Sequence, residues 1–124
     1  MRNVLLVAGG GAFGSVLRWL TSTWIARNVE PSRFPWGTLV VNVIGAFAIG
    51  ALLTLTFEHE LLPDSWRLFL VPGVLGGFTT FSAFSWEALV LLRDGNWPAA
   101  TGYVLGSVVG GLLAATAGMM MLRR

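Results

Sequence analysis

The chain has 124 residues, of which 55% are hydrophobic and only 11% are charged, and it contains no cysteine. Because soluble domains are usually about 25% charged, this composition argues against a soluble protein and predicts an integral membrane protein. The lack of cysteine excludes disulfides, thiolate metal sites and cysteine nucleophiles. The eight basic residues are arginines that, apart from Arg18, are scattered at segment ends, whereas nucleic-acid binding requires a basic stripe, so we expect no nucleic-acid partner.

Several apolar stretches are long enough to cross a membrane, which takes about 20 mostly apolar residues. The four stretches cover residues 4–26, 36–57, 68–92 and 99–122. Almost nothing remains for a soluble domain, so residues 1–124 are predicted to form a single all-α domain of four transmembrane helices. The first stretch is too long for the hydrophobic region of a signal peptide and contains an arginine, so we interpret it as mature protein.

An arginine interrupts the first stretch. Arg18 follows Gly14 by one helical turn and lies too deep to be a simple loop anchor, although its long side chain can extend toward the surface. Ionisable residues inside a membrane are functional candidates by default. We interpret Arg18 as a residue that raises the local anion concentration at a pore mouth.

The second stretch carries two polar residues on one helical face, because Thr38 and Asn42 are four residues apart. Amides and hydroxyls need hydrogen-bond partners in hydrocarbon. One interpretation is hydrogen bonding between helices, which contributes roughly 1 kcal/mol or less. The other is that the amide and the hydroxyl donate hydrogen bonds to a passing solute, and this pair alone leaves both interpretations open.

The third stretch is predicted to be broken near its middle. The residues that disfavour a continuous helix there are Pro72, Gly73, Gly76 and Gly77. They favour a break between about residues 73 and 80. A break frees backbone carbonyls that can hold a small cation, and the helix that begins after it directs its N-terminal N–H groups at anions.

Rings and hydroxyls run side by side after that break. Phe81 and Phe84 are three residues apart, as are Ser82 and Ser85, so they form adjacent stripes on the helix. Hydroxyls donate hydrogen bonds, and the positive edge of a phenyl ring can stabilise an anion without one. The donors have no matching set of buried carboxylates, which favours an anion path. Glu87 follows the stripes and could pair with an arginine, but an acid beside an anion path has no obvious benefit.

Small residues form a ridge along the fourth stretch. The ridge consists of Gly102, Gly106, Gly110, Ala114 and Gly118. Small residues at this spacing let helix backbones approach closely. The ridge predicts tight helix packing, either within one subunit or between two.

The arginines are divided almost evenly between the two faces of a four-span protein. One face holds four (Arg2, Arg67, Arg123 and Arg124) and the other holds three (Arg27, Arg33 and Arg93). Since an excess of Lys and Arg sets membrane orientation, this balance predicts copies inserted in both orientations that pair as an antiparallel homodimer. A single, weakly biased topology is the alternative. A bundle of four helices is mostly filled by its own side chains, which also favours an oligomer.

Three other functions explain the sequence less well. Proton-coupled export of organic cations calls for a carboxylate deep in the bundle, commonly in the first helix, but residues 4–26 contain no acid. A non-transporting assembly subunit would explain the ridge of small residues but not the hydroxyl and amide donors. An enzyme is disfavoured, because the spans carry no paired acid and base, metal cluster or nucleophile arrangement.

Three sequence blocks together resemble the small fluoride channels of bacteria, the Fluc or CrcB family. The blocks are residues 9–14 (Gly-Gly-Gly-Ala-Phe-Gly) with Arg18, residues 37–42 (Gly-Thr-Leu-Val-Val-Asn) with Gly45, and residues 76–82 (Gly-Gly-Phe-Thr-Thr-Phe-Ser). Each block is modest alone, but the three in this order are specific, and the resemblance covers essentially the whole chain. It implies a passive fluoride channel that exports cytoplasmic fluoride, rejects chloride and confers fluoride resistance.

The resemblance also implies an assembly and a set of site residues. The assembly is a dual-topology antiparallel homodimer in the bacterial plasma (inner) membrane, with two pores and a structural sodium ion on its two-fold axis. The sodium ligands would be the backbone carbonyls of Gly76 and Thr79, and Arg18 would be the vestibule arginine. The implied fluoride pathway contains Thr38, Asn42, Phe81, Ser82, Phe84, Ser85, Tyr103 and Ser107. Fluoride rather than chloride rests on the resemblance, since donors and ring edges suit anions generally.

Overall fold

The computed structural model describes residues 1–29 and 33–123, and the regular structure in these ranges is helical. Its elements are α1 (Arg2–Val29), α2 (Trp36–Phe57), α3 (Asp64–Leu68), the π-helix η1 (Phe69–Leu75), α4 (Gly76–Phe78), α5 (Phe81–Arg93) and α6 (Trp97–Leu122). Elements α3 to α5 form one bent span, so the described chain has four helical stretches long and apolar enough to cross a membrane. The predicted all-α fold with a broken third span is confirmed.

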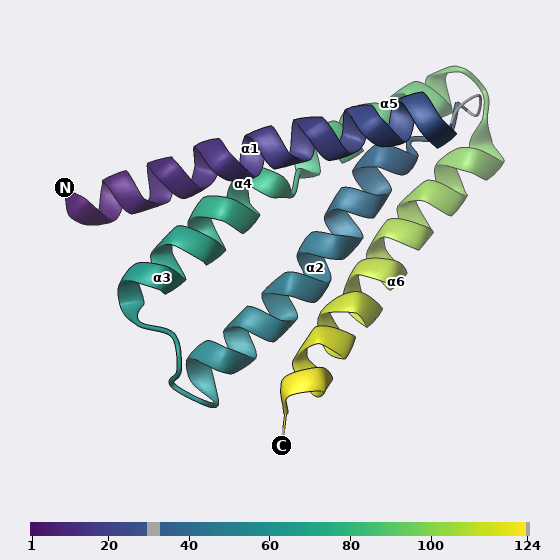
Figure 1. Cartoon of the computed structure of the whole chain (residues 1–124). Helices are drawn as coiled ribbons and strands as arrows, with labels where there is room; N and C mark the ends of the chain where they lie inside the picture. The colour runs from purple at the N-terminus through teal and green to yellow at the C-terminus, as the bar shows by residue number, and fades with distance from the viewer. Residues whose placement is uncertain (30–32, 124) are drawn as a thin grey trace.

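Two pairs of elements make most of the packing. Helix α2 lies beside α6, whereas α1 lies across η1 and α4 (Figure 1). Helix α5 packs on the N-terminal part of α6, where Ala88, Leu91, Ala100 and Tyr103 form a buried cluster. The break between α4 and α5 therefore lies between two packed pairs of elements.

The interruption of the third span falls at Thr79 and Thr80. Both residues are extended, with φ and ψ of −79° and 154° at Thr79 and −148° and 118° at Thr80. The chain passes Pro72 in η1, whose π-type hydrogen bonds reach one residue further back than those of an α-helix. The helical structure continues through the glycines, so the break lies at the end of the predicted interval.

Glycines bring α1 into backbone contact with the third span. A Cβ on Gly10 would overlap the carbonyl oxygen of Phe69, and a Cβ on Gly14 would overlap that of Val74. In the opposite direction, a Cβ on Gly77 would overlap the carbonyl oxygen of Gly11. Gly77, one of the residues that predicted a break, thus also serves close helix packing.

We expect Gly14→Ala to destabilise the folded protein, because its new methyl group would collide with backbone atoms rather than with a movable side chain. Overpacking of this kind typically costs about 1–3 kcal/mol, and we expect the free energy of unfolding to fall by that amount. Thermal unfolding in detergent measures it. Gly9→Ala is the matched control, since a Cβ on Gly9 meets nothing within 4 Å; equal melting temperatures for the two variants would contradict the packing argument.

The ridge of small residues on α6 divides into two parts. Toward the C-terminus, Gly118 packs against the backbone of Phe47, and Gly50 of α2 packs against the backbone of Ala115. Toward the N-terminus, added Cβ atoms on Gly102 and Gly106 meet nothing within 4 Å. The first part therefore packs within the chain, and the second part is open.

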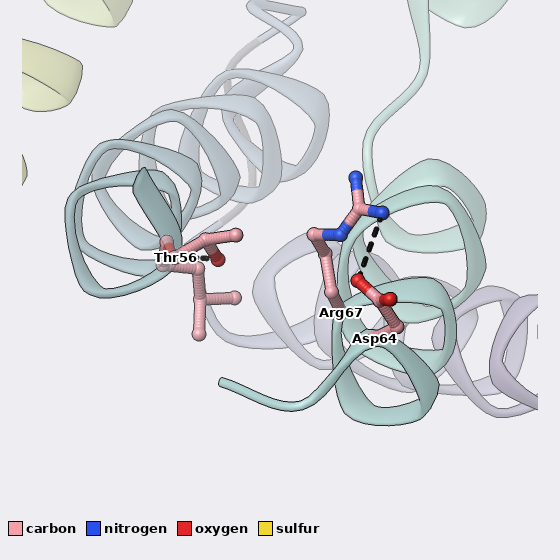
Figure 2. Close-up of polar contacts among 4 residues, drawn as sticks. Thr56, Asp64 and Arg67 are labelled. Atoms are coloured by element: carbon pink, nitrogen blue, oxygen red, sulfur yellow. Dashed lines mark hydrogen bonds and ion pairs between the residues drawn. The ribbon is translucent and has the colours of Figure 1, made fainter. Parts of the chain in front are cut away.

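The connection between α2 and α3 carries polar groups at one end of the bundle. Arg67 and Asp64 form an ion pair at 3.2 Å, and the hydroxyl of Thr56 donates to the carbonyl of Leu52 in the last turns of α2 (Figure 2). His59 Nε2 lies 2.7 Å from the carbonyl oxygen of Leu122, so this connection also contacts the end of α6. His59 is partly buried.

Candidate functional site at the break in the third span

Asn42, on α2, hydrogen-bonds both polar backbone groups of Thr80 at the break. Its amide Nδ2 donates to the carbonyl oxygen of Thr80 at 3.0 Å, and its Oδ1 accepts from the N–H of Thr80 at 2.8 Å. In a continuous helix the Thr80 N–H would donate to the carbonyl of Gly76. Asn42 therefore takes the donor that the Gly76 carbonyl would otherwise have.

The side chain of Thr80 likewise takes the helical donor away from the carbonyl of Thr79. Thr80 caps α5, and its Oγ1 accepts from the N–H of Ala83 at 3.2 Å. In a continuous helix that N–H would donate to the Thr79 carbonyl. The two carbonyls implied as sodium ligands, those of Gly76 and Thr79, are thus the two whose helical donors are diverted to side chains.

An aromatic row continues from the break into the bundle. The ring centroids of Phe81 and Phe84 are 5.7 Å apart, and those of Phe84 and Tyr103 are 5.1 Å apart. Phe34 adds an edge-on contact to Tyr103, with a centroid distance of 5.5 Å and an interplanar angle of 87°. The row begins at a ring that the single chain leaves 79% exposed, Phe81.

The hydroxyls of the α5 stripe lie on the open side of the chain. Ser82 and Ser85 are both exposed. The Ser85 hydroxyl donates to the carbonyl of Phe81 at 2.9 Å, and the Ser82 hydroxyl lies 3.3 Å from that of Thr80. The N–H groups of Phe81 and Ser82 belong to the first turn of α5, which has no carbonyls of its own to receive them.

Glu87 joins three helices, a role that the sequence did not reveal. Its Oε1 accepts from the hydroxyl of Thr38 on α2 at 2.9 Å, and its Oε2 accepts from the hydroxyl of Tyr103 on α6 at 2.7 Å. Thr38 and Tyr103 are both buried. In this arrangement their hydroxyl protons point at Glu87 rather than at a solute. The available signal was that Thr38 and Tyr103 lie near the start of the second and fourth spans and Glu87 toward the end of the third, which places all three toward the same side of the bundle.

Ser107 has a buried hydroxyl that none of the described residues hydrogen-bonds. It follows Tyr103 by one turn of α6. A serine in a helix often donates to the carbonyl four residues earlier, and this serine does not. Its proton is therefore available to another acceptor.

Two hollows adjoin these residues. One, of about 480 Å³, is lined by residues around the break, among them Asn42, Gly45, Thr79 and Phe81. The other, of about 350 Å³, is lined by Glu87 together with Arg33, Trp86, Asp94 and Asn96. Hollows of this size hold water or a small ion with ease.

Arg18 extends from α1 to the break. Its Nη1 donates to the carbonyl oxygen of Thr79 at 3.5 Å, and the contact is partly buried. Nine of the eleven predicted site residues are thus brought together in two groups: Arg18, Asn42, Gly76, Thr79, Phe81 and Ser82 surround the break, and Thr38, Phe84 and Tyr103 lie near Glu87. Ser85 lies further along the exposed face of α5, and Ser107 lies one turn beyond Tyr103 on α6. Thr80, which caps α5 and bonds Asn42, was not predicted as a site residue.

These features define a class of protein: a multi-pass membrane protein whose third span is broken beside partly buried polar groups and an aromatic row that begins at an exposed ring. Residues 5–119 match the family described as "CrcB-like protein, Camphor Resistance (CrcB)", and the chain belongs to that family.

Curated relatives match the chain over nearly its whole length. One from Anaeromyxobacter sp. (strain K) is 47% identical over 123 residues, which cover 99% of this chain and 97% of the relative. One from Rhizobium meliloti (strain 1021) is 46% identical over 123 residues, covering 99% and 98%. One from Chloroflexus aurantiacus is 46% identical over 119 residues, covering 96% and 94%. All three are named fluoride-specific ion channel FluC.

Proposed function

We propose that this protein is a fluoride-specific ion channel, not an enzyme, that lets fluoride leave the cytoplasm across the bacterial inner membrane. Family membership and the names of relatives 46–47% identical to it support this function. The single structural observation that carries it is the row of Phe81 and Phe84 with Ser82 and Ser85 directly after the break. Neutral donors and ring edges there can replace the hydration of a small anion.

The working unit in this proposal is an antiparallel homodimer with two pores. The single chain leaves Phe81, Ser82 and Ser85 exposed, and Phe81 lines a hollow of about 480 Å³, so one chain supplies only part of a pore wall. A second copy would supply the rest. The near balance of arginines between the two faces, four against three, supports insertion in both orientations.

A structural sodium ion on the two-fold axis is the third part of the proposal. Carbonyl oxygens are suitable ligands for a hard cation, and the carbonyls of Gly76 and Thr79 have lost their helical donors. Two carbonyls from one chain leave most of the coordination shell of a cation open. An antiparallel partner would contribute the same two oxygens and double the number of ligands.

Passive flow is sufficient for this function. Hydrogen fluoride crosses membranes as a neutral acid and dissociates inside a cell whose surroundings are acidic, so the anion accumulates. A negative interior potential drives it out with about 2.3 kcal/mol per charge per 100 mV. The carboxylate of Glu87 accepts hydrogen bonds from two hydroxyls, those of Thr38 and Tyr103, which offset its charge near the route of an anion.

Liposomes containing the purified protein test the function directly. Vesicles loaded with fluoride or with chloride are given an ionophore that sets the membrane potential, and ion-selective electrodes follow release. We expect rapid release of fluoride and retention of chloride. Equal release of both anions would contradict fluoride specificity, and uptake of an organic cation coupled to protons would replace the channel with an exporter.

The free hydroxyl of Ser107 gives a sharper test of the pathway. Because that hydroxyl has no partner among the described residues, Ser107→Ala should not lower the melting temperature. If the hydroxyl donates to passing fluoride, the same change should slow release by roughly tenfold, which corresponds to one lost hydrogen bond. Thr116→Ala is the control, since that hydroxyl on α6 already donates to the carbonyl of Leu112 at 2.8 Å. Unchanged release by Ser107→Ala would remove Ser107 from the pathway.

A further inference from the structure

Arg18 extends from the middle of α1 to the break in the third span, 61 residues further along the chain. Its Nη1 donates to the carbonyl oxygen of Thr79 at 3.5 Å. Among residues 1–29 and 33–123 the ion pair found is Arg67 with Asp64, so no carboxylate there neutralises Arg18. A partly buried guanidinium is therefore directed at a backbone carbonyl instead of at an acid.

The position of Arg18 is set by backbone packing. Gly14, one turn earlier on α1, lies so close to the third span that an added Cβ would overlap the carbonyl oxygen of Val74 and come within 2.9 Å of the N atom of Phe78. No side chain separates the two backbones at that point. The Arg18 side chain therefore begins next to the segment that ends at the break, and its contact with Thr79 follows from the helix crossing.

The carbonyl that Arg18 approaches is one of the two proposed for sodium. Its helical donor, the N–H of Ala83, is diverted to the hydroxyl of Thr80. A guanidinium hydrogen bond and a sodium ion would both draw on the Thr79 oxygen, and the two positive charges would repel each other across a partly buried site. Contact of the guanidinium with the Thr79 oxygen therefore opposes binding of sodium to it.

We propose that Arg18 competes with sodium for the Thr79 carbonyl and so weakens sodium binding. This inference rests on the proposed function, and in particular on its sodium site. When sodium takes the carbonyl, the guanidinium is displaced and its charge stays close to the hollow that Thr79 and Phe81 line. Arg18 thereby links occupancy of the cation site to the electrostatics of the anion route.

The test is a sodium titration of thermal stability with the purified full-length protein. N-methyl-D-glucamine replaces sodium at constant ionic strength, and the sodium concentration that gives half of the maximal stabilisation is measured. We expect that concentration to fall roughly tenfold in Arg18→Gln, because one nearby charge shifts an ionic equilibrium by about a factor of ten or more. An unchanged or higher concentration would overturn the inference.

Arg67→Gln is the matched control, because it removes the same charge from an exposed ion pair, and its sodium titration should equal that of the wild type. Arg18→Lys keeps the charge and loses the planar fork, so it should shift the titration in the same direction by less. It also serves if Arg18→Gln does not fold. A wild type whose stability ignores sodium would overturn the inference.

Fluoride release from liposomes separates this inference from the function. Release by a wild-type protein that ignores sodium would leave the channel standing and remove the inference. A wild type that binds sodium, shows the Arg18→Gln shift and releases no fluoride would retain the inference about this site and remove the proposed channel.

Discussion

Asn42→Asp is expected to slow fluoride release by at least about tenfold while the protein still folds. The change removes the amide donor from the carbonyl of Thr80 and places a second oxygen beside it. Loss of one hydrogen bond that the ion makes along its route raises its barrier by about 1.4 kcal/mol or more, which is about tenfold in rate. A negative charge at this position would also repel an anion. Release from liposomes gives the rate, and size-exclusion chromatography checks the assembly.

Asn28→Asp is the control for that experiment. It makes the same chemical change in an exposed residue whose amide donates to the carbonyl of Trp24 on its own helix. We expect it to release fluoride at the wild-type rate. Wild-type release by Asn42→Asp as well would show that permeation depends neither on the hydrogen bonds to Thr80 nor on the Asn42 amide.

Glu87→Ala is expected to cause the largest loss of stability among single changes outside the backbone contacts. It leaves the hydroxyls of Thr38 and Tyr103, both buried, without their acceptor. At about 1–3 kcal/mol for each stranded group, the loss is a large part of the 5–15 kcal/mol that typically stabilises a fold. Thermal unfolding in detergent measures it.

Two further variants distinguish the hydrogen bonds from the side-chain volume. Glu58→Ala, in an exposed loop position, should leave the melting temperature unchanged. The triple change of Glu87→Leu with Thr38→Val and Tyr103→Phe removes donors and acceptor together, so it should recover much of the stability. If Glu87→Ala melts like the wild type, the three-helix contact contributes little to stability.

The sequence predicted the elements of this fold well because membrane spans are long and their composition is distinctive. Arg18 and Glu87 show the limit. Each is a single ionisable residue in an apolar stretch, which marks it as a candidate for function. Its partner is a backbone carbonyl or a pair of hydroxyls on other helices. Only the packing of those helices decides which of them it meets.

The exact position of the break could not be predicted from the sequence for the same reason, because it depends on a partner from another helix. The proline and the glycines correctly indicated an interruption, but helical structure continues through them, and Gly73 of η1 and Gly77 of α4 pack against the backbone of α1. The chain leaves the helix at Thr79 and Thr80, where Asn42, 38 residues away in sequence, takes both polar backbone groups of Thr80. Local propensity carries no information about a partner so distant.

The paired hydrogen bonds from Asn42 to Thr80 have a mechanical consequence. Because they tie the start of α5 to α2, the third span cannot straighten or rotate at this point without breaking both bonds. The kink is thus held at a fixed angle and does not act as a hinge. A pore beside it would therefore have one wall of fixed shape at this point.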